Sequence, residues 1–175
     1  HNRDYIAQPL YPEVAALMRL GDGLRGRGAG AGPEVAAMLD LHCPTLRGEW
    51  NDRAYLVGSS DPFVWENQQA FMATLERLRR GPVPFDPQRC LLPYGVAWNK
   101  AESPAEQADG ARKAQLRSSA GWARDTFPEA LLTATLETAY ADALGVEVNA
   151  ESARAIGRDL ARALDAHLDG FGVKP

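Results

Sequence analysis

Short apolar runs typical of β-strands alternate along this chain with longer segments of helical spacing. A buried strand is predicted over 35–41, after a glycine-rich loop and Pro33, and two more are predicted over 54–58 and 131–137. A further short strand is expected within 91–98. Strands separated by helices indicate an α/β layered domain, and 175 residues are enough for one such domain with its own core.

Four helices are predicted from apolar residues that recur on one face and from helix-capping residues. Their expected bounds are 12–21, 62–81, about 111–123 and 150 onward. The last is the clearest, because Asn149 can cap it and its apolar side chains lie four residues apart: Ile156, Leu160, Leu164 and Leu168. The segment 21–32 is expected to be a mobile surface loop, and 101–110 a loop over the surface.

Charge and hydropathy argue against two classes of protein. The net charge is −4, and the densest basic spot, Arg77, Arg79 and Arg80, is too small for the sustained basic face that binds nucleic acid. We expect these arginines to solvate the end of a helix. No stretch approaches the roughly 20 apolar residues of a membrane span. Neither a nucleic-acid partner nor a membrane span is therefore predicted.

The start of the chain and its cysteines bear on its cellular setting. The sequence begins with His1 rather than Met, directly inside a motif described below, so we expect that its true N-terminus lies upstream. The location stays open, with a secreted or periplasmic setting modestly favoured. Cys43 and Cys90 leave two alternatives, a disulfide or two free thiols.

His42 stands where the first predicted strand ends, so its imidazole is expected at the edge of a sheet. Catalytic zinc takes three protein ligands, and His42 is the best candidate because His1 is terminal and His167 is expected on a solvated stretch of the last helix. The alternative is a hydrogen-bonded core histidine. Asp40 lies on the same strand face and could orient the imidazole or bond to a neighbouring loop. Cys43 points the other way and is expected to be a packed thiol.

Two further motifs carry groups suited to hydrolysis. Glu137 ends an otherwise uncharged predicted strand, where it is either a catalytic carboxylate or a surface or salt-bridged glutamate. Arg3, next to Asn2, has a planar fork that can form two parallel charge-assisted bonds to a carboxylate. An arginine fork, an imidazole and a glutamate at strand ends are the parts of a metal-assisted hydrolase.

In this order the three motifs resemble the zinc carboxypeptidase (M14) family, specifically the C-terminal part of its catalytic domain. The motifs are Asn2-Arg3, Asp40-Leu41-His42-Cys43-Pro44 and the strand that ends at Glu137. The resemblance continues with Tyr140, Gly145 and a helix that opens with Asn-Ala-Glu-Ser. It implies a carboxypeptidase-like α/β fold, a mixed β-sheet flanked by helices, in which 1–175 forms the C-terminal part of a single peptidase domain.

The resemblance also implies roles for these residues. His42 would be a ligand of Zn²⁺ with Asp40 behind it, Glu137 would activate water and pass the proton to the leaving amine, and Asn2 with Arg3 would hold the terminal carboxylate of a peptide substrate. Tyr94 and Tyr140 are candidates for the mobile tyrosine of the family.

The His-x-x-Glu motif, which supplies the other zinc ligands in that family, is absent from the sequence. We therefore expect those ligands upstream of His1 or on a separate chain, and predict that this chain alone is inactive. Peptide C-termini and peptidoglycan stem peptides are both candidate substrates. The alternatives are a non-catalytic module that binds peptides or carboxylates, and an α/β domain whose motif matches are coincidental.

Overall fold

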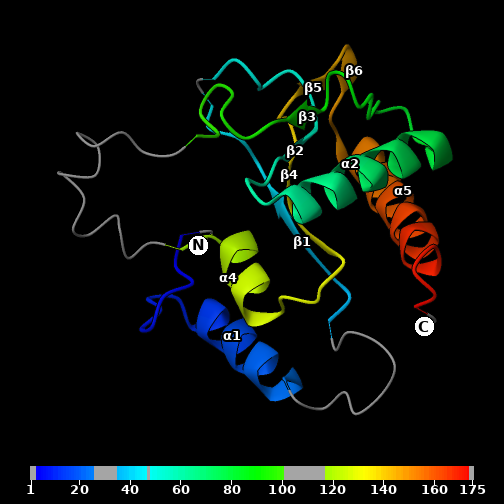
Figure 1. The fold of residues 1–175 in the computed structure, drawn as a ribbon. Helices are drawn as coiled ribbons and strands as arrows, with labels where there is room; N and C mark the ends of the chain where they lie inside the picture. Colours follow the sequence, from blue (N-terminus) through cyan, green and yellow to red (C-terminus); the bar gives the residue numbers. More distant parts are fainter. Residues whose placement is uncertain (1–2, 26–34, 47, 101–116, 174–175) are drawn as a thin grey trace. The chain divides into compact units, whose positions relative to one another are not determined.

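The computed structural model describes residues 3–25, 35–46, 48–100 and 117–173. The chain forms two compact units: unit 1 comprises His1–Met38 and Lys100–Thr133, and unit 2 comprises Leu39–Asn99 and Ala134–Pro175. The fold is mixed α/β, with a mixed sheet flanked by helices, as predicted. The elements (Figure 1) are α1 (Pro12–Leu24), β1 (Ala37–His42), β2 (Tyr55–Val57), α2 (Pro62–Leu78), β3 (Leu91–Leu92), α4 (Ser119–Thr126), β4 (Leu132–Glu137), β5 (Asp142–Ala143), β6 (Val146–Glu147) and α5 (Ala150–Asp169).

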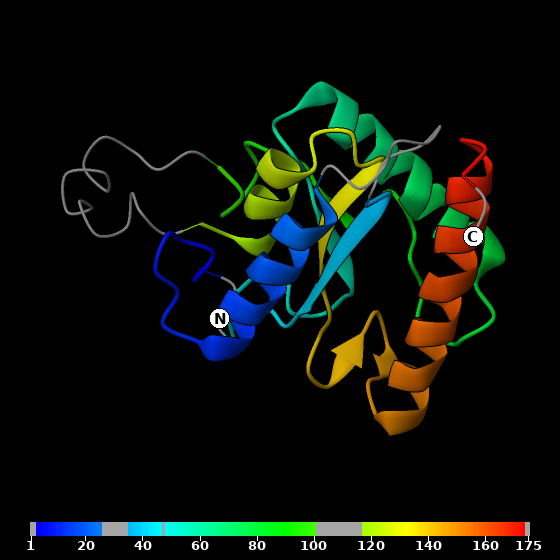
Figure 2. The same cartoon turned by 90° about the horizontal axis from the view of Figure 1, so that it is seen from below.

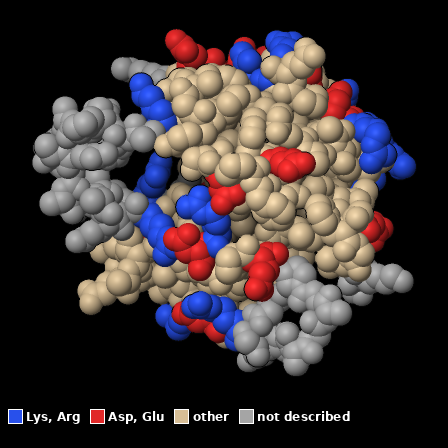
Figure 3. Space-filling model, in the orientation of Figure 1, with Lys and Arg blue, Asp and Glu red and all other residues tan. Residues whose placement is uncertain are grey.

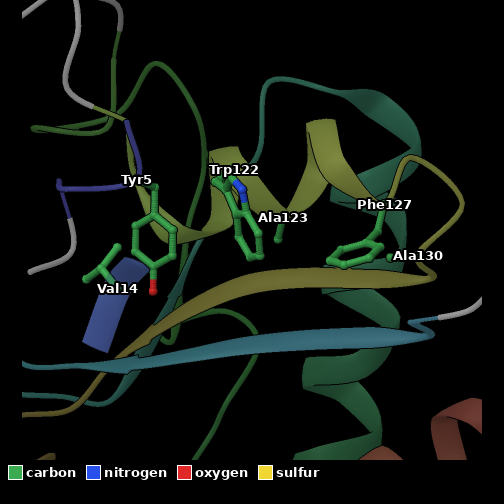
Figure 4. Packing of buried hydrophobic residues seen from close by; sticks show 6 residues of the cluster. All are labelled: Tyr5, Val14, Trp122, Ala123, Phe127 and Ala130. Carbon is green, nitrogen blue, oxygen red and sulfur yellow. The ribbon is translucent and has the colours of Figure 1, made fainter. Parts of the chain in front are cut away.

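The core of unit 1 is an aromatic cluster between α1, α4 and the segment after α4 (Figure 4). Its buried members are Tyr5, Val14, Trp122, Ala123, Phe127 and Ala130. Helix α1 was predicted to stop at Gly21, but it continues to Leu24. The reason is packing: a Cβ on Gly21 would come within 2.7 Å of the Trp122 ring, so this glycine allows a close approach and does not end the helix.

Helix α4 begins later than predicted. The Ser118 hydroxyl accepts a hydrogen bond from the N–H of Gly121 and caps the helix, which starts at Ser119. Residues 111–116 of the predicted helix, the loop 101–110 and most of the loop 21–32 lie outside the described residues. The predicted break at Phe127-Pro128 is confirmed, because α4 ends at Thr126.

The sheet has the strand order β1-β4-β2-β3 (Figure 1). Strand β2 is antiparallel to β4 and parallel to β3. All six residues of β4 are buried, which suits an inner strand. The prediction that β1 is a buried strand is wrong: it lies at an edge of the described sheet, and Leu41 is 62% exposed.

Helices α2 and α5 of unit 2 lie side by side (Figures 1 and 2). Both have side-chain N-caps: the Asp61 carboxylate accepts from the N–H groups of Phe63 and Val64, and Asn149, the predicted cap, forms a capping box with Ser152. Helix α2 ends at Leu78, three residues before the predicted end at Gly81.

Asp159 on α5 ties this helix to the chain that follows α2. Its buried carboxylate accepts hydrogen bonds from the N–H groups of Arg80 (3.0 Å) and Gly81 (2.9 Å), and also pairs with Arg162. Arg79 pairs with Glu76 at 3.0 Å. Within the arginine spot, Arg79 thus has a specific side-chain partner and Arg80 donates its backbone N–H, so these two residues do more than solvate a helix end.

A two-stranded hairpin, β5–β6, was not predicted. Its two-residue turn places Leu144 at φ 56° and Gly145 at φ 86°, the left-handed conformations that such turns require. Because each strand has only two residues, no alternating pattern marks it in the sequence. Its tip is anchored by the Leu144 N–H, which donates to the carbonyl of Asp52 at 2.6 Å.

The surface carries both acidic and basic side chains, as the composition implies. Both kinds occur on the face shown in Figure 3, several of them next to one another. Among the described residues, no helix has the length and apolar character needed to cross a membrane.

Candidate active site at the ends of three strands

His42 and Glu137 lie level with each other at the ends of neighbouring strands. The carbonyl of His42 accepts a hydrogen bond from the N–H of Thr138 at 2.8 Å. Strands β1 and β4 run parallel. In a parallel pair, a residue whose carbonyl accepts from an N–H lies level with the residue that precedes the donor. His42 is therefore level with Glu137, which precedes Thr138. A bond at the other end of the two strands gives the same register: the carbonyl of Ala36 accepts from the N–H of Leu132 at 3.3 Å. Residues that are level in a ladder point to the same face of a sheet.

Tyr55 extends this pair into a row of three. It is the direct antiparallel partner of Glu137, so its side chain also points to that face. The row His42, Glu137 and Tyr55 therefore crosses β1, β4 and β2, and all three residues belong to unit 2.

Burial increases along this row. The His42 side chain is 39% exposed, whereas Glu137 is 6% exposed and Tyr55 is fully buried. Burial, with the nearby charge of Glu137, raises the pKa of Tyr55 to about 12. The phenol therefore keeps its proton at neutral pH. The buried Glu137 side chain is its neighbour in the row, and the partly accessible imidazole of His42 lies on the other side of Glu137.

The rings of Trp50 and Trp98 pack against Tyr55. The ring centroids of Trp50 and Trp98 lie 5.1 Å and 6.4 Å from that of Tyr55. The guanidinium of Arg53 lies 4.9 Å from the Trp50 ring centre and pairs with Asp52 at 2.7 Å. Trp98 is 48% exposed, so its ring links the buried phenol to the surface.

The loop that carries Trp98 is held by the side chain of Asn99. Its amide donates to the carbonyls of Gly58 (2.8 Å) and Leu92 (3.1 Å), just after β2 and at the end of β3. Ala97 has φ 49°, a left-handed conformation that this anchoring has to hold in place. The loop is thus attached to β3 and to the end of β2, the strand of the row that carries Tyr55.

Asp40 lies beside His42, on the face that the alternation along the strand predicts. Its Oδ1 is 4.0 Å from Nδ1 of His42, at the limit of an ion pair and beyond hydrogen-bond distance. As placed here, Asp40 does not fix the orientation of the imidazole by a hydrogen bond.

The donor set does not complete a zinc site. A catalytic zinc needs three protein ligands, and in the part of the chain that the structure describes no three His, Cys, Asp or Glu side chains gather in a way that could hold a metal. His42, partly exposed at the end of β1, can supply one ligand, so the others would have to come from elsewhere.

The Asn-Arg motif belongs to unit 1. Asn2 lies outside the described residues, and Arg3 is exposed. The next residue, Asp4, is buried, and its carboxylate accepts from the N–H groups of Leu10 (3.0 Å) and Tyr11 (2.9 Å). Asp4 thus fixes the chain just before α1, a role that the sequence did not suggest.

The burial of two side chains differs from the prediction. Cys43 is exposed rather than packed, because β1 ends at His42 and strand alternation no longer applies, and both Cys43 and Cys90 are free. His167 is buried rather than solvated, since its ring contacts Phe71 and Phe171.

The two candidates for a mobile tyrosine, Tyr94 and Tyr140, are 46% and 53% exposed. Sequence reasoning missed Tyr55, Trp50 and Trp98. The only signal was that Tyr55 lies in the predicted strand 54–58, and no sequence pattern places Trp50 and Trp98 beside it.

Comparison of this chain with models of protein families and with curated protein sequences gave no match.

Proposed function

We propose that this chain is the C-terminal part of a zinc-dependent metallopeptidase domain of carboxypeptidase type, which hydrolyses a peptide or amide bond. The observation that carries the proposal is the level pair of His42 and Glu137 on one sheet face. The motifs that contain them were singled out from the sequence alone. The mixed sheet between helices is compatible with a carboxypeptidase-like fold.

Each residue has a specific task in this proposal. Glu137 takes a proton from the attacking water and returns it to the leaving amine, and its burial keeps competing solvent away. Arg3 and Asn2 bind the terminal carboxylate of the substrate. His42 would contribute one ligand to Zn²⁺, and a zinc ion held there would supply Lewis-acid chemistry for the scissile carbonyl and the attacking water. The remaining ligands would have to come from outside the described residues.

The test is peptide hydrolysis by the complete protein and two variants. Glu137→Gln should lower kcat by roughly 10²- to 10⁴-fold, because the amide cannot take up the proton. Glu147→Gln, which changes an exposed glutamate of β6, is the matched control and should keep full activity. His42→Ala should lose both activity and bound zinc, measured by elemental analysis. Full activity in both site variants would refute the assignment.

A second candidate is a non-catalytic module that binds peptides by their carboxylate. It is favoured by the donor set, because the described residues bring only one imidazole to the row. A binder would hold a peptide with a free C-terminus more tightly than its C-terminal amide, and would leave both intact. Titration calorimetry followed by mass analysis of the peptide separates the two functions.

A further inference from the structure

We propose that Tyr55 is a positioning residue for Glu137: its hydroxyl group donates a hydrogen bond to one water molecule, which in turn donates to the Glu137 carboxylate. This inference rests on the proposed function, since it concerns the group that we propose as the base. It goes beyond that function by assigning a second residue, on another strand, to the control of that base.

The first support is placement. Tyr55 and Glu137 are direct cross-strand partners, and their side chains share one face of the sheet. Tyr55 is fully buried, and among the described residues no acceptor lies within hydrogen-bond distance of its hydroxyl. A buried hydroxyl without a partner is costly, so native proteins pair such groups with protein or with ordered water.

The second support is the direction of donation. The Trp98 N–H and the positive charge of Arg53 both favour the phenolate form of Tyr55. Neither group can accept a hydrogen bond from the hydroxyl. The hydroxyl hydrogen therefore needs an acceptor. Glu137, whose charge acts on the phenol, is an acceptor when ionised. Because a tyrosine side chain is longer than a glutamate side chain, one bridging water suits this pair.

The third support is rigidity. The Tyr55 ring packs against Trp50 and against Trp98, and the N–H of Leu56 donates to the carbonyl of Cys90 at 2.9 Å. Ring packing and the backbone hydrogen bond thus fix the position of the hydroxyl. A donor that cannot move away favours the ionised carboxylate and holds it in one orientation.

The decisive test is the titration of Glu137 in the complete protein, labelled with ¹³C at the glutamate carboxyl carbons. Tyr55→Phe keeps the ring and removes only the hydroxyl. The midpoint of the Glu137 titration should then move to higher pH, by about a tenfold gain in proton affinity, the size of one hydrogen bond to a charged group. Tyr11→Phe, at an exposed position of unit 1, should leave the midpoint where it is. An unchanged midpoint in Tyr55→Phe would overturn the proposal.

A second measurement reads the same contact without changing Tyr55. With tyrosine labelled at Cζ, Glu137→Gln should shift the Tyr55 resonance at neutral pH and leave that of Tyr11 in place. An unmoved Tyr55 resonance would also overturn the proposal. This measurement keeps the inference testable if the phenylalanine variant fails to fold.

Kinetics separate this proposal from the proposed function. If the protein hydrolyses peptides, Tyr55→Phe should move the acidic limb of the kcat/KM profile to higher pH and lower kcat about tenfold, with little change in KM. A residue that serves only for packing would not move that limb. If neither the wild type nor any variant hydrolyses peptides, the proposed function fails, while the two NMR results still decide whether Tyr55 holds Glu137.

Discussion

Glu137 on β4 and Tyr55 on β2 are direct cross-strand partners, although 81 positions separate them in the chain. Antiparallel pairing places the carboxylate beside the buried phenol, and the parallel pairing of β1 with β4 places His42 on the other side. Three chemically distinct side chains are thus aligned by backbone hydrogen bonds alone. The sheet register, rather than any side-chain contact, assembles the candidate site.

Two glycines of α1 should respond in opposite ways to alanine. Gly21→Ala places a methyl group 2.7 Å from the Trp122 ring and should destabilise unit 1 by about 1–3 kcal/mol. Gly23→Ala meets nothing within 4 Å and should stabilise the helix by about 0.5–1 kcal/mol. Urea denaturation followed by Trp fluorescence measures both. Equal effects of the two changes would show that Gly21 is not a packing position.

Removing the Asp159 carboxylate should destabilise unit 2. Asp159→Ala leaves the N–H groups of Arg80 and Gly81 without their acceptor and Arg162 without its partner. We expect a loss of about 2–4 kcal/mol in the free energy of unfolding. Asp165→Ala, at an exposed position of the same helix, is the control and should change it by less than about 0.5 kcal/mol. Similar losses in both variants would argue against the tie between α5 and the end of α2.

His167 should make the stability of the protein depend on pH below about 6.5. Burial lowers the pKa of its imidazole, so below that pH the unfolded chain binds a proton that the folded chain does not. Stability should therefore fall as the pH decreases, by up to about 1.4 kcal/mol per pH unit, until the lowered pKa of the folded state is reached. The measurement is urea denaturation between pH 7.5 and 5.

The control for this pH dependence is a second histidine. His167→Phe should reduce the slope, whereas His42→Asn, at a partly exposed site, should retain it. A slope that is the same in wild type and His167→Phe would contradict the assignment to His167.

The two cysteines should differ in reactivity. Cys90 is fully buried, and burial raises the pKa of its thiol to about 12, so almost none is thiolate at neutral pH. Cys43 is exposed and free. N-ethylmaleimide at pH 7 should label Cys43 in the folded protein, and Cys90 only after denaturation, as read by peptide mass mapping. Equal labelling of both in the folded state would contradict the burial of Cys90.

Arg3 should matter for the carboxylate of the substrate if the peptidase proposal holds. Arg3→Ala should raise KM about 10- to 100-fold for peptides with a free C-terminus, the cost of losing a charge-assisted pair. It should have little effect on C-terminal amides. Arg19→Ala, at an exposed position of α1, is the control. Equal effects of Arg3→Ala on free acids and amides would remove Arg3 from the substrate-binding role.

The sequence was most informative where local chemistry sets the structure. Helix α5 was predicted because Asn149 caps it and its apolar residues repeat at helical spacing, and both signals act within a few residues. The inner strand β4 was recognised from its uncharged run. The hairpin β5–β6 was missed because two-residue strands leave no periodic pattern.

By itself the sequence determined the α/β class, most of the helices and strands, and the positions of His42 and Glu137 at strand ends. Only the tertiary structure decided that β1 is an edge strand, that His167 is buried, and that Tyr55 lies level with Glu137. The physical reason is that capping and periodicity are local interactions, whereas register, strand order and burial depend on contacts between segments far apart in the chain.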